Sequence, residues 1–189
     1  MPSFDLRNIN IAEYQREGTS VSYGTPESIG DAMSCTLELR FAEGRLYAES
    51  KLAEFIKKAT GGTISVAVKY IPQSAQSLMY GAQPKTRNEA TGLAYSAKDV
   101  SKYVGVSFFA PDMIDSVEKF TCVFVPKAMF GPPSMSYQTK GESITFNTPT
   151  TTGEFLADDS TAQTLLETAV CDTEEEARAW CNAVLGGTT

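Results

Sequence analysis

The chain has no histidine, one tryptophan and four cysteines in 189 residues. Histidine is the side chain most often used for acid–base catalysis near neutral pH and is a common zinc ligand. The cysteines at positions 35, 122, 171 and 181 form no C-x-x-C pair. A nucleophile elbow and a phosphate-binding glycine loop are also missing. We therefore expect no enzyme activity, no cofactor and no metal, with reduced thiols packed as small apolar groups.

Long hydrophobic runs are absent as well. No apolar stretch approaches the roughly 20 residues that a membrane-spanning helix needs. The first residues, Met1 to Asp5, contain neither a basic patch nor an apolar core of signal-peptide length. We expect no membrane association and residence in the cytoplasm where the chain is made. The length suits one domain with extensions.

Positive charge is scarce, with 16 Lys and Arg against 23 Asp and Glu, a net charge of −7 and a pI near 4.7. Binding to a phosphate backbone is driven by cationic side chains that release counterions, so this balance argues against nucleic-acid binding. An acidic surface would instead suit a wall past which DNA slides without sticking. Simple solubility explains the same balance equally well.

Two-residue alternation of apolar and polar side chains predicts several strands. Two of them, 102–109 and 119–126, are apolar on both faces. Both faces must therefore be covered, which places these strands centrally in two packed sheets or a closed barrel. The predicted strands are 7–14, 34–41, 63–70, 102–109 and 119–126.

Helical signals occur at three further places. Pro72 and Gly81 bracket a short helix expected to lie against a sheet, and 81–99 follows as a polar connection. A weak helical stripe covers 162–170. Thr173 and Glu176 then form a capping box, which predicts a second helix that ends at Gly186. Its apolar face should dock on its own subunit or on a neighbour; it carries Ala177, Trp180, Cys181, Val184 and Leu185.

The passage 43–62 is ambiguous. Its apolar residues recur at i, i+3, i+4 and i+7: Leu52, Phe55, Ile56 and Ala59. With Ser50 as the N-cap and Gly61-Gly62 as the stop, this spacing predicts an amphipathic helix over 50–60. Phe55 and Ile56 are large, so they need a cover whichever conformation the passage adopts.

The segment 132–155 has the clearest hairpin pattern, with alternation on both sides of a tight turn at 139–142. Pro149 cannot donate to a strand ladder, so the returning strand should end or reach a sheet edge there before it resumes toward Phe155.

The same segment also carries a run of specific motifs. They are Pro133-Ser134, Thr139-Lys140-Gly141-Glu142-Ser143-Ile144, Phe146, Thr148-Pro149-Thr150 and Gly153. In these residues the chain resembles the major tail proteins of long-tailed bacteriophages, a family of tail-tube subunits. Weaker similarities extend the resemblance over residues 5–157.

The resemblance implies a mainly β fold with α elements (α+β). The tail-tube body, a β-sandwich or barrel with a flanking short helix, would span 1–157 and include an extended loop at 43–62. A C-terminal helical extension at 158–189 has no counterpart in the matching part. Such subunits join into hexameric rings that stack into a tail tube, the channel for DNA ejection into the host.

In this family the passage equivalent to 43–62 is a long extended loop or hairpin that reaches a neighbouring subunit, which leaves the helix and the interface as open alternatives. The interface interpretation places Arg45, Tyr47, Lys51, Phe55 and Ile56 between subunits.

The partners implied by the resemblance are further copies of the chain and the tail-tip, tape-measure and tail terminator proteins. Double-stranded DNA would pass through the lumen without specific binding. The protein would be assembled in the host cytoplasm and end in the virion. Two alternatives remain, a ring or tube protein of a contractile secretion or bacteriocin device and a soluble β-sandwich binding module.

Overall fold

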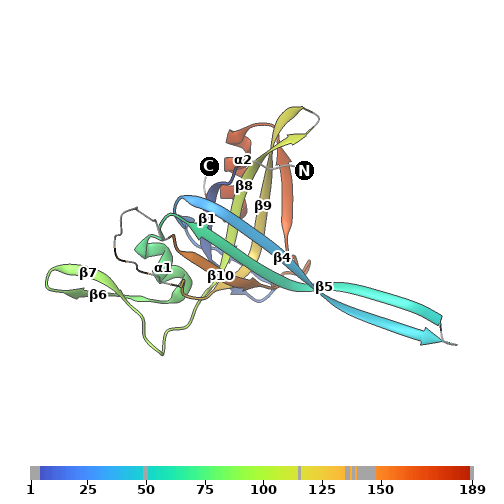
Figure 1. Cartoon of the computed structure of the whole chain (residues 1–189), viewed down its shortest axis with the longest axis horizontal. Helices are drawn as coiled ribbons and strands as arrows, with labels where there is room; N and C mark the ends of the chain where they lie inside the picture. Colours follow the sequence, from blue (N-terminus) through green and yellow to red (C-terminus); the bar gives the residue numbers. More distant parts are fainter. Residues whose placement is uncertain are drawn as a thin grey trace.

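Strands make up most of the chain in the computed structural model, which describes residues 5–48, 51–114, 116–134, 137, 139 and 148–187 (Figure 1). The expected mainly β fold with α elements is confirmed. The elements are β1 (Arg7–Glu17), β2 (Ser20–Tyr23), β3 (Glu27–Ser28), β4 (Ala32–Ala48), β5 (Lys51–Val68), α1 (Gln73–Tyr80), β6 (Gln83–Arg87), β7 (Ala90–Ala94), β8 (Tyr103–Ile114), β9 (Val117–Phe130), β10 (Thr150–Phe155), β11 (Glu167–Cys171) and α2 (Glu174–Val184).

One antiparallel sheet organises the body. Its strands follow the order β2-β1-β8-β9-β10-β5-β4, with β3 added to β1 and β11 added to β9. Among the described strands β2 and β4 end this order and do not pair with each other, so the sheet is not closed and the barrel alternative is wrong. The sheet is curled instead. Ile11 of β1 and Val66 of β5, from separate parts of the strand order, lie in the same buried core.

The central strands β8 and β9 are covered on both faces, as their dense apolar sequences predict. Val106 and Val125 face the main core, into which α1 inserts Met79. On the opposite face Phe109 and Cys122 pack against α2. The two helices therefore lie over different faces of the same pair of strands.

Helix α1 agrees with its prediction at both ends. Pro72 is the N-cap, and Gly81 ends the helix with a left-handed φ of 71°. The last helical residue, Tyr80, is buried and donates a hydrogen bond from Oη to Thr151 Oγ1 at 2.9 Å. Thr151 Oγ1 in turn donates to the carbonyl of Gly131 at 3.0 Å. This relay satisfies the buried hydroxyls and fixes α1 against β10.

Helix α2 also forms with its capping box. The Oγ1 of Thr173 accepts from the Glu176 N–H at 3.2 Å, and Oε2 of Glu176 accepts from the Thr173 N–H at 3.3 Å. Ala177, Cys181 and Leu185 are fully buried against the chain's own sheet. The helix thus docks on its own subunit, the first of the two expected possibilities.

The helix expected at 162–170 is wrong, since β11 occupies the second half of that stretch. Strand β10 pairs with β9 only at Ala128–Phe130, so the β9 edge from Phe120 to Phe124 remains open. β11 fills this edge over five residue pairs. The weak helical propensity is overridden because pairing with β9 supplies backbone hydrogen bonds along the whole strand, in which the β-branched Thr168 and Val170 are favoured.

The stretch 81–99 is more than a polar connection. Strands β6 and β7 form a two-stranded hairpin that pairs with no other described strand. Its turn residues, Asn88 and Glu89, have positive φ values of 46° and 67°. Two consecutive positive φ values are typical of the type I′ turn that closes two-residue hairpins.

Residues 135, 136, 138 and 140–147 of the predicted 132–155 hairpin, which include most of its turn, lie outside the described residues. Its return is described, and Thr150 begins β10 directly after Pro149, so the chain resumes as a strand toward Phe155 as expected. β10 lies between β5 and β9. Gly153 allows the close approach, because a Cβ there would meet the Met129 carbonyl oxygen at 2.5 Å.

A polar cluster ties the segment after β10 to β1 and β9. Asp159 accepts hydrogen bonds from Tyr14 Oη at 2.9 Å and from Lys127 Nζ at 2.6 Å. Arg16 Nη1 lies 3.1 Å from the other carboxylate oxygen. Lys127 Nζ also stands 4.7 Å from the ring centroid of Tyr103. The Lys127 ammonium, and then the Tyr14 hydroxyl, lower the pKa of Asp159 below its ordinary value of 3.8.

Replacing Asp159 with asparagine is expected to lower the melting temperature at pH 7, because the variant loses the charge that Lys127 and Arg16 face. A carboxylate with a depressed folded-state pKa stabilises the fold above its unfolded-state pKa. That contribution is lost as the pH falls through the folded-state pKa. The difference in melting temperature between wild type and variant should therefore shrink as the pH falls below about 4.

Asp31→Asn is the matched control, because Asp31 is exposed and its nearest cation, Lys69, lies 3.6 Å away. Exposed pairs of this kind contribute little. Thermal melts of the three proteins at pH 7, 5 and 3 test the prediction. An Asp159→Asn effect of equal size at pH 3 would show that shape, rather than charge, matters at this position.

Candidate assembly interface

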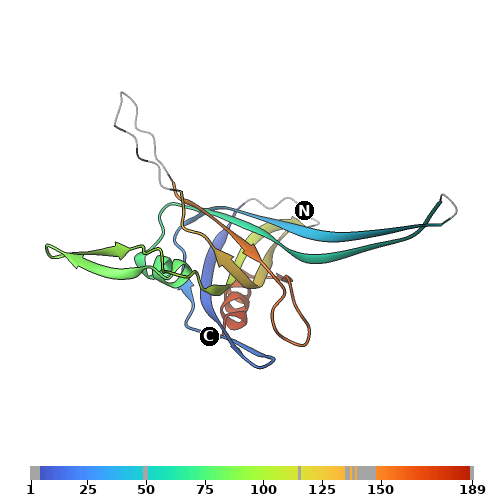
Figure 2. The ribbon, with the colours of Figure 1, turned by 90° about the horizontal axis from the view of Figure 1, so that it is seen from below.

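The candidate interface is a long exposed β-hairpin, here called the arm, made of residues 41–48 of β4 and 51–60 of β5. Figures 1 and 2 show both strands leaving the body side by side and extending well beyond it. At roughly 3.3 Å per residue the arm reaches about 26 Å from the sheet. The helix expected at 50–60 is therefore wrong, and the alternative of an extended hairpin describes the passage.

Two glycines mark the root of the arm. Arg40 pairs with Gly61 and Phe41 with Ala59, so β5 holds one extra residue at this point. Gly61 has a φ of 148°, and a Cβ there would lie 2.5 Å from the Phe155 carbonyl oxygen. The Gly61-Gly62 pair thus permits a bulge and a close crossing with β10, rather than ending a helix.

One face of the arm alternates aromatic rings and charges. Lys57 Nζ stands 4.5 Å from the Phe41 ring centroid, and Arg45 Cζ stands 5.5 Å from that of Phe55. Glu43 lies between the two cations, 3.1 Å from Lys57 Nζ and 3.5 Å from an Arg45 Nη. These contacts hold the side chains in place while leaving their rings uncovered. Tyr47 continues the same face by strand alternation and is 61% exposed.

The other face of the arm places large apolar side chains beside charged ones, since Glu54 and Lys58 lie on the same side of β5 as Ile56 by strand alternation. Ile56 is 65% exposed and Leu46 is 57% exposed. Ile56 pairs directly with Gly44, so no side chain opposite shields it. Isolated exposed apolar residues are common on proteins, but here they occupy both faces of a two-stranded projection that has no core.

The outer edges of the arm also have no strand partner among the described residues. Strand β10 covers β5 only from Gly62 to Ala67. Beyond that point β5 pairs with β4 alone among the described strands, and β4 lies at the end of the sheet order. An open strand edge is a template on which another strand can add.

The five residues predicted for the subunit interface all lie on the arm. Arg45 and Phe55 are directly paired, so they share a face, which Tyr47 extends. Ile56 lies on the opposite face, and Lys51 is exposed near the tip. The residues therefore form two surfaces rather than one patch. Their role between subunits remains a prediction.

Three further arm residues were missed at the sequence level: Phe41, Leu46 and Lys57. A signal for Phe41 was present, because the alternation of Cys35, Leu37 and Leu39 continues into it. This alternation alone would put Phe41 on a buried face, whereas the strand has already left the core at that point and the residue is 44% exposed. Lys57 gives no such signal, since its aromatic partner is defined only by the strand register.

Three of the four cysteines cluster beneath α2, although they are dispersed in the sequence. The Sγ atoms of Cys122 and Cys171 are 3.7 Å apart, and all four thiols are free. Packing as small groups is confirmed for Cys122 and Cys181, which are fully buried. Burial raises the pKa of Cys171 to about 11. Within the described residues no group of three His, Cys, Asp or Glu side chains is placed to hold a metal ion.

The comparisons with known proteins give no family for the chain: no protein-family model matches it, and no curated protein matches it. In the described part of the chain, neither helix is long and apolar enough to cross a bilayer.

Proposed function

We propose that this protein is a structural virion subunit that polymerises as stacked hexameric rings into a phage tail tube. The tube is the channel through which DNA is ejected into the host. The observation that carries the proposal is the arm, whose two faces both display large uncovered side chains. Exposing large apolar side chains on both faces of a two-stranded hairpin is unfavourable in water, unless a partner covers them.

Burial of these side chains supplies the driving force for assembly. Each large apolar side chain that becomes fully buried contributes about 1.5–3 kcal/mol. The arm offers several of them on a paired hairpin, so less conformational entropy is lost on binding than for an unpaired loop. Contacts between an arm and a different surface of the next copy are head-to-tail. Such contacts close into rings or continue as filaments, depending on the rotation between copies.

Charge complementarity supports contact between copies. The whole chain has a net charge of −7, yet cations outnumber acids in the described arm. The cations are Arg45, Lys51, Lys57 and Lys58, and the acids are Glu43 and Glu54. The remainder of the subunit is accordingly more acidic than the total, so a basic arm is attracted to the acidic body of another copy.

Negative-stain electron microscopy across a concentration series, with the mass in solution measured alongside, tests the proposal. Hollow rings or tubes that grow with concentration are the expected result. A chain that stays monomeric at high concentration, even when mixed with a tail-tip complex, would contradict self-assembly and favour the soluble binding module.

The device to which a tube belongs is a separate question. A contractile secretion or bacteriocin tube uses a similar subunit, and rings alone do not distinguish it from a phage tail. Complementation does: a phage lacking its major tail protein should form infectious particles when this chain is supplied, if its tip and tape-measure partners match. Tubes that form only with a contractile sheath would favour the alternative device.

A further inference from the structure

A second projection, the β6–β7 hairpin, lies at the end of the molecule opposite the arm (Figures 1 and 2). Every residue of β6 is exposed, and the hairpin pairs with no other described strand. Isolated two-stranded hairpins are marginally stable in water. Both of its outer backbone edges are open, which invites a partner.

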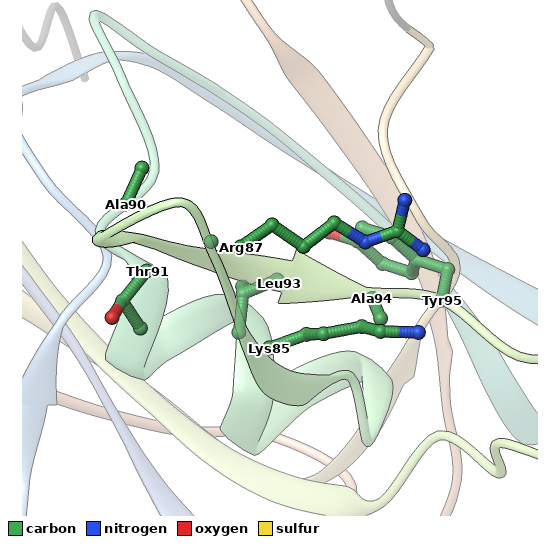
Figure 3. A pocket seen from close by; sticks show the side chains of 8 residues that line it. Lys85, Arg87, Ala90, Thr91, Leu93, Ala94 and Tyr95 are labelled. Carbon is green, nitrogen blue, oxygen red and sulfur yellow. The ribbon is translucent and has the colours of Figure 1, made fainter.

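The strand register divides the hairpin into two distinct faces. Thr86 pairs with Thr91 on one face, where their hydroxyls lie 2.9 Å apart. On the other face Lys85 is opposite Gly92 and Arg87 is opposite Ala90. Each cation thus faces a residue too small to cover it. Figure 3 shows both long side chains extended in the same direction, toward Ala94 and Tyr95.

The two cations are available for binding. Neither Lys85 nor Arg87 forms an ion pair or hydrogen bond with any residue in the described ranges, whereas most other cations of the body do. They border an open hollow of about 570 Å³, which the small residues Ala90, Gly92 and Ala94 also line. A carboxylate can approach both side chains from this side without displacing an internal partner.

The base of the hairpin is fixed to the core, so the cations are presented in a defined place. Tyr95 Oη donates to Gln76 Oε1 of α1 at 2.7 Å. Its ring also packs on that of Tyr80, with centroids 6.4 Å apart. Gln83 Nε2 donates to the Gly81 carbonyl at 3.0 Å. Helix α1 is itself held by the Tyr80 relay, so little ordering is required when a partner binds.

We propose that the β6–β7 hairpin is a second contact between copies, in which Lys85 and Arg87 bind carboxylate side chains on the acidic body of a neighbouring subunit. This inference depends on the proposed function, because its partner is a second copy. Charge complementarity selects that partner: the chain has 23 acidic residues and a net charge of −7, which attracts these cations and repels a nucleic acid.

Reversing both charges, in Lys85→Glu with Arg87→Glu, tests the contact. The concentration at which half of the protein is assembled should rise at least tenfold in about 50 mM salt. Assembly of the wild type should weaken more steeply with added salt than that of the charge-reversed variant, because screening weakens the additional ion pairs of the wild type. The charge-conserving pair Lys85→Arg and Arg87→Lys is the matched control and should assemble as the wild type does. The melting temperatures of all three proteins should agree, since the side chains of Lys85 and Arg87 are exposed and not part of the core.

A zero-length carbodiimide cross-link identifies the partner directly. This reagent joins a lysine amine to a carboxylate in contact, and mixing ¹⁴N- and ¹⁵N-labelled subunits separates links between copies from links within one. We expect a mixed-isotope link from Lys85 to an Asp or Glu, absent in Lys85→Arg. Wild-type rings with no such link, and with unchanged assembly of the charge-reversed variant, would overturn this inference alone. Failure of the wild type to assemble would overturn the proposed function as well.

Discussion

Replacing Phe55 and Ile56 together with serine will block assembly and leave the subunit folded. Both side chains are about half exposed or more, at 48% and 65%, and they lie on opposite faces of the arm. Their removal therefore leaves no internal cavity. Because only about half of each side chain remains to be buried between copies, the loss is about 1.5–3 kcal/mol in total. At 1.4 kcal/mol per factor of ten, the assembly concentration should rise at least about tenfold.

The matched control changes two exposed apolar residues elsewhere, Met113 and Val117 at the β8–β9 end, to serine. This control should assemble as the wild type does. Sedimentation gives the assembled fraction, and thermal melting of dilute protein gives the fold. Two results would contradict the interpretation of the arm. Tubes formed by the double variant would remove it as an interface, and loss of cooperative melting would make Phe55 and Ile56 part of the fold.

The separate changes carry additional information, because the register places the two residues on different surfaces. If a neighbour clasps the arm, each single variant should weaken assembly, and the two effects should add. If the arm lies with only one face on the next copy, one of the two single variants should weaken assembly nearly as much as the double variant does. The same assay thus reports how the arm is covered.

The sequence predicts the body well and the projections poorly, for a physical reason. Strands in the body alternate or are continuously apolar because one or both faces are buried, so β8, β9 and the inner half of β5 are recognisable from pattern alone. The arm has no core side. Its apolar residues therefore follow no core-facing alternation, and their spacing at 52, 55, 56 and 59 coincides with helical periodicity.

The remaining errors have the same origin. β11 forms because β9 extends past β10 and leaves an open edge, a fact of tertiary pairing that no local pattern in 162–170 contains. The β6–β7 hairpin depends on Asn88 and Glu89 at positive φ, and its exposed strands lack the apolar alternation that marks a buried face. Capping, by contrast, is local, so the start of α2 at Thr173 follows from the sequence alone.

The largest effect on stability is expected from Gly62→Ala at the root of the arm. Here β5 passes between β4 and β10, and an added Cβ would lie 2.2 Å from the Glu38 carbonyl oxygen and 2.4 Å from Phe155 Cζ. Neither neighbour can withdraw easily, since Glu38 is held in the β4–β5 ladder and the Phe155 ring is fully buried. Overpacking of this kind costs about 3 kcal/mol, which corresponds to a fall in melting temperature of about 6–12 °C.

Gly44→Ala is the control, because it adds the same methyl group to the same hairpin at a point where nothing lies within 4 Å. Its melting temperature should stay at or slightly above that of the wild type, since alanine restricts the unfolded chain more than glycine does. Calorimetry on dilute protein compares the two. If Gly62→Ala melts like Gly44→Ala, β4 can move away from β5 at this crossing. The arm would then pivot at its root, and its direction in an assembly would be set by the neighbour that binds it rather than by the subunit's own sheet.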